Sequence, residues 1–216
     1  MTDRAVRPIT EAGAIRRMRR GVNILTAKDP ALAAIVAHAG PPEIALRPPG
    51  FPTLLRAIVA QQVSAAAART IYSRIEAATD SPPTAAAVAA LGTENLRALG
   101  LTGRKTEYIL GLAEAELTGA LDFAALARMP DERAIATLVA LRGIGRWTAE
   151  VYLLFALARP DVWPAADLAL AVAAGRMRGL TARPTFPEAA KIAEAWRPWR
   201  GAAAILLWHY YRTMPA

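Results

Sequence analysis

Apolar residues return every three or four positions along most of the chain, which is the spacing of one face of an α-helix. Three segments show the pattern clearly and are rich in strong helix formers: 53-TLLRAIVAQQVSAAAARTIYSRIEAA-78, 105-KTEYILGLAEAEL-117 and 132-ERAIATLVAL-141. No segment has the sustained alternation of a half-buried strand. The pattern predicts an all-α protein of about a dozen short helices without an internal repeat.

Local signals predict where several helices begin and where loops lie. Asp29-Pro30 is typical of an N-cap followed by proline in the first turn, and Thr185 with Glu188 fits a capping box. Clusters of proline and glycine predict loops at Gly40-Pro41-Pro42, Pro48-Pro49-Gly50 and Ser81-Pro82-Pro83.

Composition and charge narrow the classes of function. The 216 residues are 54% hydrophobic, which suffices for a packed core in one domain or in two small lobes. A formal net charge of +8 favours polyanionic partners, with nucleic acid first and an anionic membrane surface second. Most of the positive charge comes from arginine, which can form bidentate contacts with phosphate. A GC-rich genome would explain the high arginine content equally well.

The composition excludes several kinds of site and leaves few residues for others. The chain has no cysteine, which excludes disulfides, thiolate nucleophiles and Cys-ligated zinc or iron–sulfur clusters. His38 and His209 lie far apart in the sequence and leave little for a histidine metal site. The N-terminal MTDRAVRPIT has no apolar signal region, and the run 151-VYLLFALA-158 is too short to cross a bilayer, so we expect a cytoplasmic protein.

The stretch 141-LRGIGRWTAE-150 predicts a turn between two helices, 132–141 and 146–158. Its glycines, Gly143 and Gly145, can adopt positive φ and would expose backbone N–H groups at the start of the second helix. The helix dipole favours an anion there, so a phosphate would fit. An ordinary helical hairpin with a glycine turn explains the same letters, and the stretch alone leaves both interpretations open.

The longer run 141-LRGIGRWTAEVYLLFALARPDVWPAADLAL-170 resembles the helix-hairpin-helix DNA glycosylases, specifically the DNA-3-methyladenine glycosylase II branch. Three further stretches resemble the same branch, and the resemblance covers roughly residues 45 to 212: 50-GFPTLLRAIVAQQVSAAAA-68, 98-ALGLTGRKTEYILGLA-113 and 195-AWRPWRGAAAILLWHYY-211. The resemblance implies a two-lobed helical fold with the active site in the cleft between the lobes. One lobe would combine residues 1–48 and 165–216, and the other would span residues 49–164 and end in the hairpin 132–158.

The resemblance also implies the chemistry. Relatives that cut the DNA strand carry a lysine nucleophile where this chain has Trp147, so we expect a monofunctional enzyme that hydrolyses the N-glycosidic bond and leaves an abasic site. The family pattern places the catalytic carboxylate at Asp167, where it would oppose the positive charge growing on the sugar or orient water. A plain N-cap is the alternative for Asp167, and Glu150 and Asp161 are the other acidic residues nearby.

No general acid accompanies Asp167 in the sequence, which favours a leaving base that already carries positive charge, such as 3-methyladenine or 7-methylguanine. Cationic bases stack well on indole faces, so Trp147 is the first candidate for a pocket wall. The family's second pocket aromatic is replaced by Val151, which leaves the lesion range open. Further pocket candidates, each of which could equally be core, are Tyr152, Trp163, Trp196 and Trp199, whereas Trp208 is expected in the core.

Double-stranded DNA is the expected partner, and the enzyme must flip its target base out of the helix. The resemblance places an intercalating wedge at Gln62 beside Gln61, for which an exposed Gln pair on a helix is an equal alternative. The remaining DNA contacts are expected from Arg104, Lys105, Gly143, Ile144, Gly145, Arg146 and Thr148. The family's hairpin also holds a monovalent cation, Na⁺ or K⁺, whose carbonyl ligands here would be Val139, Leu141 and Ile144.

Two other functions remain open on the sequence. A non-catalytic helix-hairpin-helix DNA-binding protein would explain the charge and the turn, but not the stretch around Asp167. A related glycosylase for a neutral, deaminated base would explain both, and it predicts polar pocket groups that the sequence does not identify. We expect a monomer without any required cofactor or iron–sulfur cluster.

Overall fold

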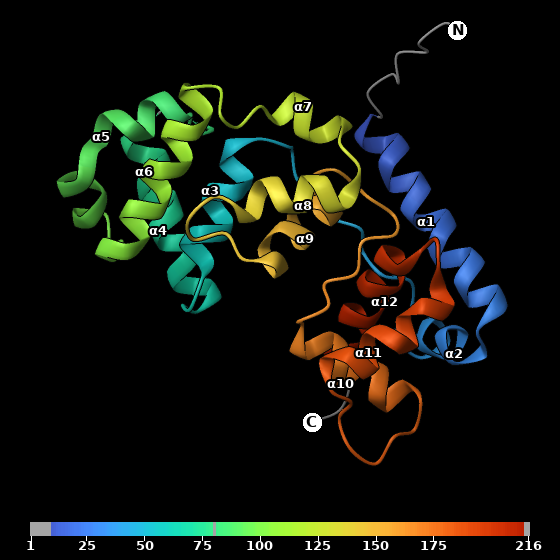
Figure 1. Cartoon of the computed structure of the whole chain (residues 1–216). Helices are drawn as coiled ribbons and strands as arrows, with labels where there is room; N and C mark the ends of the chain where they lie inside the picture. The colour runs from blue at the N-terminus through green and yellow to red at the C-terminus, as the bar shows by residue number, and fades with distance from the viewer. Residues whose placement is uncertain (1–9, 80, 214–216) are drawn as a thin grey trace, which may run out of the picture. The chain divides into compact units, whose positions relative to one another are not determined.

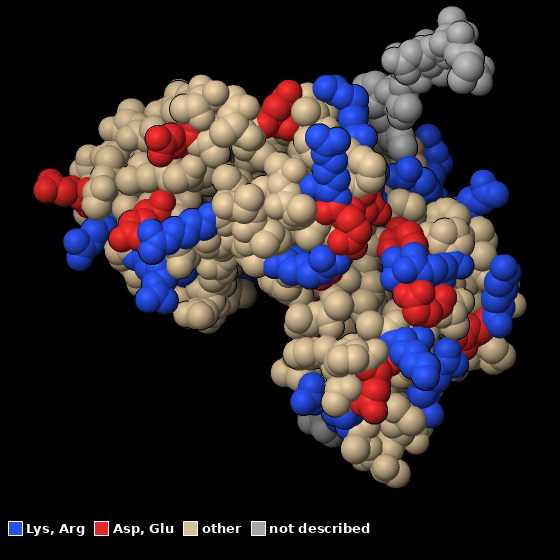
Figure 2. Space-filling view, in the orientation of Figure 1, with Lys and Arg blue, Asp and Glu red and all other residues tan. Residues whose placement is uncertain are grey.

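The computed structural model describes residues 10–79 and 81–213, and the regular elements in these ranges are twelve α-helices and one short 3₁₀-helix (Figure 1). The prediction of an all-α protein is therefore confirmed. No helix in these ranges is long and apolar enough to cross a membrane. On the face drawn in Figure 2, Lys and Arg side chains alternate with Asp and Glu, so this face does not carry one continuous basic surface.

The chain divides into two compact units. Unit 1 contains the described residues up to Leu46 and from Ala158 onward, and unit 2 contains Arg47–Leu157. The sequence placed the two boundaries after residues 48 and 164 instead. In both divisions the helix-hairpin-helix segment belongs to one unit and Asp167 to the other.

Unit 2 is built around the two helices of the hairpin and the helices that support them. Helix α6 packs against α5 and α3, and α8 packs against α9. The core includes Ile58, Ile109, Leu138 and Leu153, all fully buried. The seven helices are α3 (Phe51–Ala60), α4 (Ala65–Ala78), α5 (Ala85–Ala98), α6 (Gly103–Leu117), α7 (Phe123–Arg128), α8 (Asp131–Val139) and α9 (Arg146–Phe155).

Unit 1 is organised around its last helix. Gly201 to Leu207 in α12 are all buried, as expected for a helix that is apolar on every side, and α12 packs against α1, α2 and α10. The helices of this unit are α1 (Glu11–Lys28), α2 (Pro30–Ala39), α10 (Leu168–Met177), α11 (Phe186–Ala193), the 3₁₀-helix η1 (Glu194–Trp196) and α12 (Arg200–Thr213).

The predicted helix starts in unit 1 are confirmed. Thr185 and Glu188 form a complete capping box on α11. Asp29 caps α2 through the Ala31 N–H, and its carboxylate also accepts from the Trp196 indole at 3.0 Å and pairs with Arg178 at 2.6 Å. Burial alone would raise the pKa of Asp29, but the hydrogen bonds from Trp196, Arg178 and Ala31, with the charge of Arg178, lower it overall.

The continuous helical pattern over residues 53–78 proved wrong as a single helix. The structure ends α3 at Ala60 and starts α4 at Ala65, with a turn at residues 61–64. Gln62 adopts a left-handed backbone with φ 54°, which an α-helix cannot accommodate, and the Ser64 hydroxyl accepts from the Ala67 N–H to cap α4.

Candidate active site

The hairpin turn between α8 and α9 contains two glycines with different roles. Gly143 provides a backbone conformation that other residues rarely adopt, and Gly145 leaves the space around its Cα open. Both glycines can adopt positive φ, but only Gly143 does, at 90°, whereas Gly145 has φ −84°. A Cβ atom on Gly143 would lie 2.8 Å from the Tyr108 Cβ and closer still to the Tyr108 ring. A Cβ atom on Gly145 would meet nothing within 4 Å.

Helix α9 therefore begins at an open surface. Its N-cap is Gly145, which offers no side-chain cap to the N–H groups of the first turn. Those N–H groups and the helix dipole favour an anion at this end. Two residues expected to contact DNA, Ile144 and Thr148, are buried at 4% and 6% exposure, so their side chains support the hairpin. Any contribution that Ile144 or Thr148 makes to an anion site would come from the backbone.

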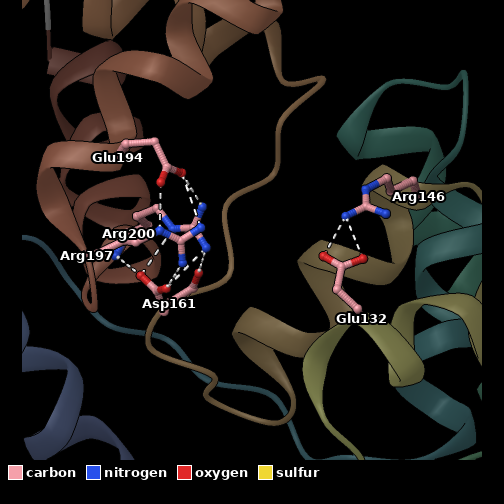
Figure 3. A network of polar contacts seen from close by, with 6 residues as sticks. All are labelled: Glu132, Arg146, Asp161, Glu194, Arg197 and Arg200. Atoms are coloured by element: carbon pink, nitrogen blue, oxygen red, sulfur yellow. Dashed lines mark hydrogen bonds and ion pairs between the residues drawn. The ribbon is translucent and has the colours of Figure 1, made fainter.

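Arg146, the first residue of α9, is held by acidic residues of its own unit. Its guanidinium group donates to Glu132 at 2.8 Å, which ties α8 to α9 (Figure 3). It also donates to the buried Glu150 at 2.9 Å. The hydrogen bond that Arg146 donates to Glu132 is the main reason that the pKa of Arg146 is raised. A phosphate contact by this side chain would compete with these two carboxylates.

The turn at residues 61–64, here called the glutamine turn, faces the hairpin turn. Gln61 Nε2 donates to the Gly143 carbonyl at 2.9 Å, and Gln62 is exposed next to Val63. Gln61 and Gln62 therefore lie in a turn, and not on an exposed helix, which was the alternative to the wedge. A hollow of ≈ 520 Å³ is lined by both turns and by the start of α6: Gln61, Gln62, Val63, Thr102, Arg104, Lys105, Tyr108, Val139, Leu141, Arg142, Gly143, Ile144 and Gly145.

The two basic residues at the start of α6 differ in their surroundings. Arg104 is exposed, as a phosphate contact requires. Lys105 is 8% exposed, and its ammonium group donates to the Val59 carbonyl at 2.8 Å. Burial lowers the pKa of Lys105. Lys105 therefore supports the end of α3, and Arg104 is the better placed of the two for DNA.

Asp167 begins α10 in unit 1. It is the N-cap residue, and its Oδ1 accepts from the Leu170 N–H at 2.8 Å and from the Trp208 indole N–H at 3.1 Å. The side chain is 8% exposed. The N-cap interpretation and the catalytic one are therefore compatible, because the capping bond holds the carboxylate in one orientation.

The two alternative carboxylates sit in ion pairs that explain their presence structurally. Glu150 is 3% exposed and pairs with Arg146. Asp161 pairs with Arg197 and Arg200 and also accepts from the Arg200 backbone N–H, which caps α12 (Figure 3). Asp161 is therefore a capping and ion-pairing residue.

A family model described as "HhH-GPD superfamily base excision DNA repair protein" matches residues 55–198, about two thirds of the chain. The chain belongs to the HhH-GPD superfamily. It is 34% identical over 161 residues to DNA-3-methyladenine glycosylase 1 of Schizosaccharomyces pombe, which covers 73% of this chain and 71% of that protein.

Two solved HhH-GPD structures agree with the fold. A DNA-3-methyladenine glycosidase from Bacillus halodurans matches with a TM-score of 0.80 and 31% identity, covering 89% of each chain. The S. pombe 3-methyladenine DNA glycosylase Mag1, solved in complex with abasic DNA, matches with a TM-score of 0.78 and 30% identity, covering 88% of this chain and 95% of that one.

Within this HhH-GPD protein, most of the aromatic pocket candidates belong to cores. Trp163 and Trp196 are 6% and 1% exposed, with ring centroids 5.9 Å apart. Tyr152 is 2% exposed; its hydroxyl accepts from the Gly50 N–H, and burial raises its pKa to about 12. Core packing accounts for these three residues. Trp199 is half-buried, and Trp147 is 42% exposed on α9.

Trp208 is the residue that the sequence assigned differently. It was expected in the core, but it is half-buried and donates its indole N–H to Asp167. The two residues lie 41 positions apart, so no local pattern connects them. The fourth stretch resembling the family, 195–211, contains Trp208 and was the only signal available.

The carbonyl groups expected to hold a monovalent cation belong to residues that line the hollow at the hairpin. Val139, Leu141 and Ile144 surround the turn, and the Leu141 carbonyl also accepts the Ile144 N–H at 3.1 Å. A carbonyl oxygen has two lone pairs, so this bond leaves room for a cation. In the described residues no group of three His, Cys, Asp or Glu side chains could hold a metal ion.

Proposed function

We propose that the protein is a monofunctional DNA glycosylase that removes alkylated purines, of the 3-methyladenine and 7-methylguanine type, from double-stranded DNA. The family match and the names of the similar proteins support a DNA glycosylase, and the setting of Asp167 carries the catalytic assignment. We further propose that it acts as a monomer.

Asp167 would supply the negative charge that the reaction needs. Cleavage of an N-glycosidic bond builds positive charge on the sugar, and a fixed carboxylate stabilises that charge or orients the attacking water. The Leu170 N–H and the Trp208 indole hold one oxygen of Asp167, so the carboxylate needs little reorganisation when the charge develops. Trp208 would thus act as a positioning residue.

Trp147 supports both the absence of strand cleavage and the choice of base. An indole cannot form the Schiff base that a lysine nucleophile forms, so no strand cleavage is expected from this position. Its exposed ring can stack against a flat, positively charged base. Such a contact contributes ~1 kcal/mol or more when water is excluded.

The hairpin and the glutamine turn would hold the DNA. A phosphate would bind at the open start of α9, with Arg104 and the exposed Arg142 adding positive charge. Gln62 would enter the space left by the flipped base. A monovalent cation held by Val139, Leu141 and Ile144 would supply further positive charge for that phosphate.

The proposal is tested by single-turnover assays on four duplexes: one treated with a methylating agent, one containing uracil, one containing hypoxanthine and one undamaged. Free bases and strand breaks are both measured. We expect release of 3-methyladenine or 7-methylguanine, with strand breaks only after alkaline treatment. Release from the uracil duplex alone would support a glycosylase for neutral bases, and binding without release would support a DNA-binding protein.

A further inference from the structure

The glutamine turn and the hairpin turn are connected to each other and to the same helix. Gln61 Nε2 donates to the Gly143 carbonyl at 2.9 Å, which joins the two turns directly across 82 residues of sequence. Helix α6 supports both turns, because the Lys105 ammonium group donates to the Val59 carbonyl and the Tyr108 ring lies against Gly143. The two turns therefore form one supported assembly within unit 2.

Lys105 compensates for the break between α3 and α4. In a continuous helix the Val59 carbonyl would accept the N–H of Val63. The left-handed backbone at Gln62 prevents that arrangement, and the buried ammonium group of Lys105 satisfies the Val59 carbonyl instead. The broken helix is thus maintained by a specific side chain. It presents Gln62 and Val63 at the surface.

Gln61 and Gln62 have the same side chain but different surroundings. Gln62 is exposed, whereas Gln61 is half-buried and its amide is committed to the Gly143 carbonyl. This bond fixes the peptide plane of the hairpin turn just before the open start of α9. It also fixes the backbone residue that immediately precedes Gln62.

We propose that Gln61 is a positioning residue that couples phosphate binding at the hairpin turn to insertion of Gln62 into DNA. This inference rests on the proposed function. A phosphate bound at the start of α9 immobilises the hairpin turn, and the Gln61 amide transmits that order to the glutamine turn. Gln62 is then held at the edge of the hollow that both turns line, ready to replace the flipped base.

The test is a double-mutant cycle with Gln61→Met and Gln62→Ala. Methionine is unbranched and of similar volume, so it keeps the packing and removes only the amide groups. Opening of the duplex is followed by the fluorescence of 2-aminopurine next to a base analogue that cannot be excised. Base release from methylated DNA, DNA affinity and urea unfolding are measured on the same four proteins.

A positioning residue for Gln62 predicts non-additive effects. We expect Gln61→Met to reduce opening by about fivefold, the usual effect of one net hydrogen bond. The Gln62→Ala variant should lose at least as much, and the double variant should match Gln62→Ala alone. A residue with a structural role only would reduce opening by the same factor in both backgrounds.

The outcomes separate this inference from the proposed function. Equal factors in both backgrounds, or normal opening by Gln61→Met while Gln62→Ala is impaired, would overturn the positioning of Gln62 by Gln61. Normal opening by Gln62→Ala would overturn the wedge assignment and the coupling with it, while base release by the wild type would leave the glycosylase intact. Absence of base release by the wild type would overturn the proposed function.

Discussion

The two glycines of the hairpin turn offer a matched pair of substitutions with opposite expected effects. Gly143→Ala places a side chain on a residue with φ 90°, which costs roughly 1–2 kcal/mol of unfolding free energy. The new methyl group also overlaps the Tyr108 ring, and displacing a packed side chain costs ~1–3 kcal/mol more. We therefore expect a total loss of about 2–5 kcal/mol.

Gly145→Ala is the control in the same turn. Its φ of −84° is ordinary for alanine, and the added methyl group meets nothing within 4 Å. Alanine is a weaker N-cap than glycine, which destabilises the fold, but it also lowers the entropy of the unfolded chain, which stabilises the fold. These effects offset each other, so we expect the stability of Gly145→Ala to lie within about 0.5 kcal/mol of the wild type. The methyl group would nevertheless stand where a phosphate must approach, so DNA affinity should fall severalfold.

The assay is urea unfolding followed by tryptophan fluorescence and circular dichroism, together with DNA titration at fixed salt. The double variant Gly143→Ala with Tyr108→Ala isolates the contribution of the ring, because it removes the overlap with the ring and keeps the backbone strain and the 2.8 Å approach to the Cβ of residue 108. Equal stability of Gly143→Ala and Gly145→Ala would show that neither the positive φ nor the Tyr108 contact restricts position 143. Unchanged DNA affinity of Gly145→Ala would refute the phosphate site.

Four further variants test the assignment of aromatic and charged residues. Trp196→Ala should cost ~3–5 kcal/mol of stability because the ring is 1% exposed, whereas Trp147→Ala should cost much less and lower the rate of base release; equal losses of stability would contradict the assignment. Because the pKa of Asp29 is lowered, its carboxylate stabilises the protein above the ordinary pKa of 3.8 and this contribution disappears as pH falls below it, so Asp29→Asn should flatten the acid limb of stability against pH. The pKa of Tyr152 is raised from 10.0 to about 12, so its neutral hydroxyl stabilises the fold fully below pH 10 and this contribution is lost as pH rises toward 12. Tyr152→Phe should abolish that alkaline loss of stability. It should also cost ~1 kcal/mol of stability at neutral pH and leave base release unchanged.

Features that depend on neighbouring residues could be predicted from the sequence. The capping residues Asp29 and Thr185 were identified because a cap bonds to N–H groups two or three positions away. The hairpin was identified for the same reason, since Gly143 and the helices around it form one short segment. Asp167 was selected by resemblance, and its local N-cap geometry could be foreseen.

Features that depend on distant residues could not be predicted. The break after α3 is stabilised by Lys105, 46 residues away, and a periodic apolar pattern carries no trace of that bond. Arg146 was expected to contact DNA, but nothing local indicated that Glu132 would engage it from α8. The tryptophans look alike in sequence, and only three-dimensional packing separates the buried Trp163 from the exposed Trp147.

Asp167 is proposed to carry the chemistry, and the chain contains a close control for it. Asp167 and Asp29 are both N-cap carboxylates of unit 1 that accept from a helix N–H and from an indole. Asparagine caps helices as well as aspartate does and keeps an oxygen acceptor, so Asp167→Asn and Asp29→Asn each remove mainly the charge.

The decisive measurement is the single-turnover rate of base release from methylated duplex DNA by these two variants, with DNA affinity measured in parallel. We predict that Asp167→Asn loses at least about a hundredfold in rate, in the range found when one transition-state stabiliser is removed, and keeps its affinity for DNA. Asp29→Asn should release bases like the wild type at neutral pH. A fully active Asp167→Asn, or equal losses in both variants, would show that Asp167 is not the catalytic carboxylate.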